Sequence, residues 1–169
     1  MKTKRLTQLG LLTAAALILG YLEHLLPLFP GLPGVKLGLG NIVVLYALYR
    51  MDEKSALLLM LLKVVLCSLL FANAFSLLYA LAGGACSLLA MALARRLPGV
   101  SVTGVSVVGA LFHNLGQAAV ACLLLGRAAV VSYLPVLLLA AIGTGLLTGI
   151  VAKGVLRALD VKKKDGDGV

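Results

Sequence analysis

Residues 105–125 read VSVVGALFHNLGQAAVACLLL, and no charged residue interrupts them. This length matches the ~20 apolar residues that one helix needs to cross a bilayer. The apolar residues follow one another, whereas in a strand of a membrane barrel they would alternate with polar ones. The stretch therefore predicts a membrane-spanning helix. Its centre nevertheless carries three polar residues, His113, Asn114 and Gln117.

The composition of the whole chain extends this prediction. Hydrophobic residues make up 62% and charged residues 12% of the 169 residues. A soluble domain has roughly 45–50% and ~25% of these classes. A chain of this length holds about six spans joined by short loops, which excludes a separate catalytic domain outside the bilayer. The predicted fold class is an all-α integral membrane protein, a six-transmembrane-helix bundle.

Charges, prolines and glycines mark where the predicted helices end. The first helix stops at the segment 27–34, which contains three prolines. A cleaved signal peptide is the alternative for this helix, but no Ala-x-Ala-like site follows it, and Glu23 and His24 are polar. Residues 160–169 are polar and are expected to be disordered. Within a single domain of residues 1–159, we expect helices at about 6–26, 35–49, 54–71, 74–96, 103–125 and 130–159.

Lysines and arginines predict the orientation, because cytoplasmic loops of membrane proteins carry an excess of both. In a six-span arrangement the basic residues fall on one side, with Lys36, Lys63 and Arg127 as the exceptions. The protein is therefore predicted to lie in the cytoplasmic membrane, with both termini in the cytoplasm. The net charge of +9 reflects this asymmetry and an attraction to anionic lipid, and a nucleic-acid partner is not expected.

Polar residues gather at or outside the predicted midplane of the membrane. His113 lies about ten residues into its helix, and Gln117 follows one turn later on the same face. Taken alone, Asn41 or Lys63 is explained about as well by hydrogen bonds between helices as by contact with a ligand. Three polar groups on one short stretch favour a cavity that faces a ligand. The candidate substrate-binding residues are Glu23, Lys36, Asn41, His113, Asn114 and Gln117.

Small residues recur four apart on the first predicted helix, as Gly10-x-x-x-Ala14 and Ala16-x-x-x-Gly20. Such spacing lets another helix approach closely in a membrane, where hydrophobicity no longer drives helices together. Packing inside the bundle explains the glycines of the last helix. On the first helix, the same pattern is also suited to contact with another subunit.

The located residues give the chain a resemblance to the Gx transporter family, which is related to the S components of energy-coupling factor (ECF) vitamin transporters. It covers about residues 6–159 and rests on three stretches, GYLE at 20–23 with the proline-rich loop after it, PGVKLGLGN at 33–41, and GALFHNLGQ at 109–117. The resemblance implies an S-component-like bundle whose outer ends and first loop enclose a small molecule. It also implies that Gly10, Ala14, Ala16 and Gly20 contact a transmembrane coupling subunit, which two cytoplasmic ATPases drive.

Two departures from expected patterns bear on this resemblance. The family pairs two alanines where this chain has Ala16-x-x-x-Gly20, which leaves the coupling partner open. The family also carries the name heptaprenyl diphosphate synthase component I, yet the few acidic residues form no aspartate-rich motif that would hold magnesium against a diphosphate. The chain has no P-loop either, so any step driven by ATP requires partners.

The sequence leaves three hypotheses of function. The leading one is uptake of a small vitamin-like or cofactor-precursor-like solute, anionic or aromatic, without a resident cofactor. The alternative is a membrane subunit of an electron-transfer or isoprenoid system that binds a quinone or a polyprenyl lipid. An intramembrane enzyme using His113 and Glu23 is the least supported, because nothing supplies a nucleophile or metal set, and we expect no catalytic residues. Cys67, Cys86 and Cys122 lie singly in predicted helices and are interpreted as packing residues.

Overall fold

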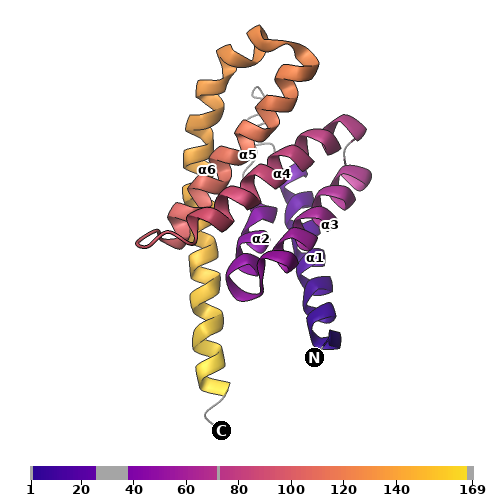
Figure 1. The fold of residues 1–169 in the computed structure, drawn as a ribbon. Helices are drawn as coiled ribbons and strands as arrows, with labels where there is room; N and C mark the ends of the chain where they lie inside the picture. The colour runs from indigo at the N-terminus through magenta and orange to yellow at the C-terminus, as the bar shows by residue number, and fades with distance from the viewer. Residues whose placement is uncertain (1, 26–37, 72, 167–169) are drawn as a thin grey trace.

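The computed structural model of the chain describes residues 2–25, 38–71 and 73–166. Within these ranges the chain forms six α-helices and no strand (Figure 1). The prediction of an all-helical protein is therefore confirmed. The helices are α1 (Lys2–Leu25), α2 (Leu39–Arg50), α3 (Glu53–Phe71), α4 (Ala74–Ala94), α5 (Val102–Leu125) and α6 (Arg127–Gly166).

Five of these helices, all except α2, are long and apolar enough to cross a membrane. α2 has only 12 residues. At 1.5 Å per residue they extend about 18 Å, less than the ~30 Å of a hydrocarbon core. α2 begins at Leu39, directly after Gly38, which adopts the left-handed conformation with φ of 72°. Residues 26–37, with Lys36 and the expected start of the second span, lie outside the described residues.

α6 is longer than the sequence predicts. Its 40 residues continue to Gly166, so the segment 160–166, which is expected to be disordered, is helical. Extending an existing helix adds a hydrogen bond for each residue without the cost of nucleation, which favours this continuation. Figure 1 shows that the end of α6 projects beyond the other helices.

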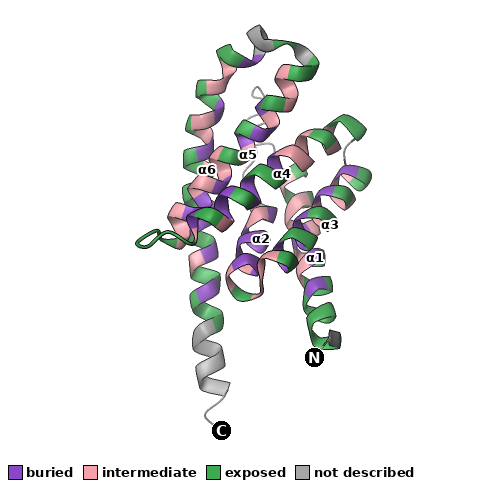
Figure 2. Cartoon of the chain, viewed as in Figure 1, coloured by how far each residue is buried: buried purple, intermediate pink, exposed green. Residues whose placement is uncertain are grey.

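The helices form two groups with α2 at the centre. α1, α2 and α3 pack against one another, and α5 packs against both α4 and α6. The groups meet where α3 contacts α4 and where α2 contacts α6. α2 is buried along most of its length, as Figure 2 shows. Its buried residues are Gly40, Ile42, Val43, Val44, Leu45, Ala47 and Leu48.

Glycines allow the close approach of α4, α5 and α6. A Cβ atom at Gly116 would lie 2.7 Å from the carbonyl oxygen of Ala82. A Cβ atom at Gly145 would lie 2.8 Å from the Cα atom of Val107. Both neighbouring atoms belong to the backbone, so a side chain at either position would push the helices apart. In a membrane such close backbone packing replaces the hydrophobic effect as a source of helix association.

Many large apolar side chains lie on the outer surface of the bundle. Large aliphatic side chains are more than 60% exposed on several helices, which a soluble protein would not tolerate in this number. The distribution fits helices that face lipid. These side chains include Leu11, Ile18, Leu69, Leu70, Leu123 and Leu139.

Ion pairs join three parts of the chain, namely α1, the turn between α2 and α3, and the segment that follows α4. Arg5 of α1 pairs with Asp52, in the turn between α2 and α3. Arg96, which follows α4, pairs with Glu53 at 2.8 Å. The hydrogen bonds that Asp52 forms with Ser55 and with Arg5 hold the pKa of this carboxyl well below its usual range.

Candidate functional site

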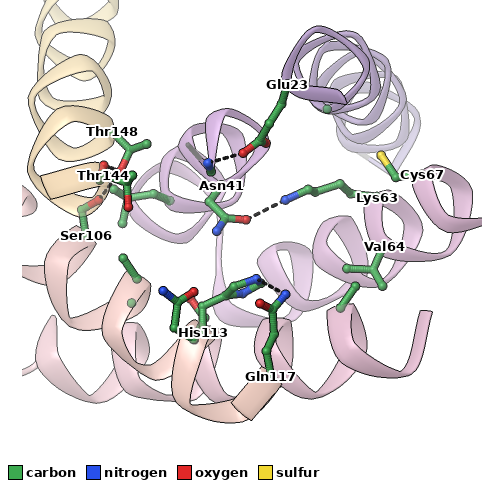
Figure 3. A pocket seen from close by; sticks show the side chains of 18 of the residues that line it. Glu23, Asn41, Lys63, Val64, Cys67, Ser106, His113, Gln117, Thr144 and Thr148 are labelled. Atoms are coloured by element: carbon green, nitrogen blue, oxygen red, sulfur yellow. Dashed lines mark hydrogen bonds between the residues drawn. The ribbon is translucent and has the colours of Figure 1, made fainter. Parts of the chain in front are cut away.

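A cavity of about 160 Å³ lies between the two groups of helices. All six helices contribute to its wall, and most of the residues at its polar positions come from α1, α2, α3 and α5 (Figure 3). Ligand pockets for drug-sized molecules measure roughly 300–1,000 Å³, so this volume fits a smaller solute. The polar and charged residues of the wall are Glu23, His24, Asn41, Lys63, Ser68, Ser76, Ser87, Ser106, His113, Asn114, Gln117, Thr144 and Thr148.

The structure brings together five of the six predicted substrate-binding residues. They come from three separate helices and line the same cavity. The sixth, Lys36, lies outside the described residues. The five are Glu23, Asn41, His113, Asn114 and Gln117.

The three polar residues of α5 make two kinds of contact. His113 and Gln117 lie one turn apart, with 3.1 Å between their Nε2 atoms. Asn114 is buried and donates a hydrogen bond from Nδ2 to the carbonyl oxygen of Leu137 in α6, at 2.9 Å. Asn114 thus ties α5 to α6. His113 and Gln117 form a polar pair at the cavity wall.

Gly83 of α4 makes room for this pair. A Cβ atom at Gly83 would lie 2.9 Å from Cγ of Gln117 and 3.1 Å from Cε1 of His113. The same atom would also lie 2.9 Å from the carbonyl oxygen of His113. The absence of a side chain at Gly83 therefore sets how closely the imidazole and the amide lie against α4.

Lys63 of α3 crosses the first turn of α2 and reaches the cavity there. Its Nζ atom donates a hydrogen bond to Oδ1 of Asn41 at 2.6 Å (Figure 3). A Cβ atom at Gly40 would lie 2.7 Å from Cε of Lys63 and 3.3 Å from the carbonyl oxygen of Ala16. Glycine at position 40 therefore provides the passage by which the lysine side chain runs between α1 and α2.

Glu23 places a carboxylate at the same turn of α2. Its Oε1 atom accepts a hydrogen bond from the backbone N–H of Gly38, the residue that caps this helix (Figure 3). The N-terminus of a helix carries a partial positive charge and unpaired N–H groups, so a carboxylate is favourable there. The first turn of α2 thus holds both a carboxylate and, through Asn41, an ammonium group.

Hydroxyl groups form the wall on the side of α5 and α6. Ser106 Oγ and Thr148 Oγ1 are 2.9 Å apart, and Thr148 donates to the carbonyl oxygen of Thr144 at 2.9 Å. The sequence did not single out these residues. Serines and threonines commonly bond to carbonyl groups of their own helix, so their presence in a span is a weak signal of a site.

Aromatic side chains lie where α1 and α3 end. The rings of Tyr21 and Phe71 have centroids 5.1 Å apart, and the rings of His24 and Phe71 stack at 6.5 Å. His24 and Phe71 also line the cavity. This end of the cavity therefore offers flat ring surfaces, in contrast to the polar groups around Asn41.

The small residues of α1 point in different directions. Gly10 and Ala14 are exposed, and a Cβ atom at Gly10 would meet no atom within 4 Å. Ala16 is fully buried, and a Cβ atom at Gly20 would lie 2.9 Å from Sγ of Cys67. Ala16 and Gly20 therefore serve packing within this chain. A partner contact at Gly10 and Ala14 stays a prediction.

Comparison with known proteins adds one finding. The chain matches the family model described as heptaprenyl diphosphate synthase component I over residues 12–155. No curated protein and no solved structure matches it. The matched range includes every residue that lines the cavity and covers most of the sequence. The chain therefore belongs to the heptaprenyl diphosphate synthase component I family.

Proposed function

We propose that this chain is a membrane-embedded binding protein that takes up a small polar solute, in the manner of an ECF-type S component. The observation that carries the proposal is the cavity, where polar groups from helices far apart in the sequence converge inside an apolar bundle. Polar and ionisable side chains are costly inside a membrane, so they are retained where they pair or serve a ligand or pathway. A vitamin-like or cofactor-precursor-like solute is the substrate class we propose.

The direction of uptake follows from the orientation proposed for the chain. Both termini lie at the same end of the bundle, and basic residues cluster there, as expected for the cytoplasmic side. Glu23 and His24 lie near the opposite end of α1, and both line the cavity. The proposed cavity thus opens outward from the cytoplasmic membrane.

Partners would supply the energy for transport. We propose a transmembrane coupling subunit and two cytoplasmic ATPases, because the chain carries no P-loop. The exposed Gly10 and Ala14 support a helix contact on α1. The chain itself is proposed to have no enzymatic activity and no resident cofactor.

The family name favours a second candidate, a membrane subunit that binds a polyprenyl lipid or a quinone in an isoprenoid or electron-transfer system. In that case the polar wall would contact the headgroup, and the tail would lie between helices. The volume of about 160 Å³ leaves no room for a long prenyl chain inside the cavity itself. The sequence also lacks the aspartate-rich motif of a prenyl synthase.

Mass spectrometry of the molecules released from the purified protein tests the proposal. We expect a small water-soluble solute in wild-type protein and much less of it in His113→Ala and Gln117→Ala. Cys86→Ser is the control, because Cys86 is exposed on α4 and does not line the cavity. Recovery of a quinone or polyprenyl lipid would favour the second candidate. Unchanged solute in His113→Ala, Asn114→Ala and Gln117→Ala would refute the assignment of the site.

A further inference from the structure

The charged groups of the cavity have an arrangement that restricts the ligand. The described wall contains one carboxylate, Glu23, and one ammonium group, Lys63. The formal charges of these two groups cancel. Placing a charged side chain inside a membrane costs free energy. An uncharged ligand would need neither the carboxylate nor the ammonium group in its site.

A single turn of α2 fixes the two charges relative to each other. Glu23 accepts a hydrogen bond from the backbone of Gly38, and Lys63 donates one to the side chain of Asn41. These two anchoring residues belong to one turn, in which the N–H of Asn41 donates to the carbonyl oxygen of Gly38 at 2.8 Å. The carboxylate and the ammonium group are therefore both held at the start of α2, in the wall of the same cavity.

On the basis of the proposed function, we infer that the cavity binds a small zwitterion, a solute with one amino and one carboxylate group. Glu23 faces the amino group and Lys63 faces the carboxylate. A carboxylate accepts several hydrogen bonds and an ammonium group donates up to three, so a single hydrogen bond saturates neither kind of group. The hydroxyl wall around Ser106 and Thr148 contacts the remainder of the solute.

Ligands with a single kind of charge fit this arrangement less well. A phosphate or diphosphate would bring several negative charges close to Glu23, and like charges repel strongly where water is scarce. A simple amine would meet the same difficulty at Lys63. The volume of about 160 Å³ limits the solute to a molecule much smaller than a drug. An amino acid or a compound of similar size satisfies all of these conditions.

The test measures binding to the purified full-length chain in detergent. Thermal shift and calorimetry with each common L-amino acid identify a binder, and mass spectrometry identifies any solute that co-purifies. The bound zwitterion is then compared with two analogues, the amine that lacks its carboxylate and the acid that lacks its amino group. We expect each analogue to bind about tenfold or more weakly, because hydrogen bonds between charged groups contribute at least that factor.

Charge variants assign the two groups separately. In Glu23→Gln the preference of the zwitterion over the acid should disappear, and in Lys63→Met its preference over the amine should disappear. If Lys63→Met does not fold, Lys63→Arg replaces it in the test. This variant keeps the positive charge and should retain part of the preference for the zwitterion over the amine. Lys54→Met is the matched control, because Lys54 is an exposed lysine on α3 outside the cavity.

Each outcome decides between the two proposals. A bound solute that lacks either charged group, or analogues that bind as tightly as the zwitterion, overturns this inference but leaves the proposed function intact. If no amino acid binds and no small polar solute is released from the protein, the proposed function fails, and the inference fails with it. A zwitterion whose preference depends on both Glu23 and Lys63 supports both.

Discussion

Replacing Gly40 with alanine should weaken solute binding while the fold survives. The added Cβ atom would lie 2.7 Å from Cε of Lys63, where ordinary contacts begin at 3.4 Å. The lysine side chain must therefore move by about 0.7 Å, the difference between these two distances. Its hydrogen bond to Asn41, now 2.6 Å long, would lengthen toward ~3.3 Å, beyond the usual range.

The two effects of this substitution differ in size. Hydrogen bonds to charged groups contribute about 1.5–3 kcal/mol, so misplacing the ammonium group should lower affinity on the order of tenfold to 100-fold. The stability of the protein should fall by less than the bond to Asn41 contributes, because the atom in the way is at the far end of a flexible side chain. Alanine also favours a helix by roughly 0.5–1 kcal/mol relative to glycine. The carbonyl oxygen of Ala16, at 3.3 Å from the new Cβ atom, needs to shift by only a few tenths of an ångström.

Calorimetry with the solute identified by mass spectrometry, together with thermal unfolding, measures both effects. Gly10→Ala is the matched control, because its Cβ atom would meet nothing within 4 Å. In a Lys63→Met background, Gly40→Ala should cost no further affinity, since the two changes act on the same group. Wild-type affinity in Gly40→Ala, or an equal loss in both backgrounds, would show that Lys63 does not contact the solute.

Three further predictions concern packing, pH and access. Gly116→Ala should lower the melting temperature sharply or prevent folding, because its Cβ atom would lie 2.7 Å from a backbone oxygen of α4. Gly143→Ala should have little effect, because its Cβ atom would meet nothing within 4 Å. Thermal unfolding of the two variants checks this. The folded-state pKa of Asp52 is lowered, so its contribution to stability is complete above the unfolded value of ~3.9 and is lost only as the pH falls through the lower folded value. The destabilisation by Asp52→Asn should then be equal at pH 7 and pH 5 and shrink below about pH 4, as unfolding midpoints would show. Cys67 lines the cavity and Cys86 does not, so the bound solute should slow labelling by N-ethylmaleimide, measured by mass spectrometry, at Cys67 alone.

The sequence predicts most of the helical fold because a bilayer imposes a simple requirement. Every backbone polar group in lipid must be satisfied, so long apolar runs become helices wherever they occur. Hydrophobicity does not predict the left-handed conformation of Gly38, which directly precedes α2. The helical segment 160–166 was missed for another reason. Polar composition predicts disorder in an isolated peptide, but here the segment extends a helix that already exists.

The sequence predicts some residues of the candidate site more clearly than others. Polar residues are rare in a span, so His113 and Gln117 stand out, and the structure places them at the cavity. Lys63 gives an ambiguous signal, because its contact with Asn41 depends on the gap above Gly40, and a sequence does not show which residue faces a gap. The spacing of Ala16 and Gly20 likewise predicts a close helix contact. It does not show that the contacting helices belong to the same chain.

The shortness of α2 has a mechanical consequence. One end of this helix holds Gly38 and Asn41 at the cavity. Its other end accepts a hydrogen bond from Arg95 at the carbonyl oxygen of Leu48, and Asp52 follows directly in the chain. The 12 residues of α2 place its first turn about 18 Å from these contacts at its other end, with one continuous helix between them. If a solute displaces the first turn of α2, we therefore expect the ion pairs at the other end of this helix to respond.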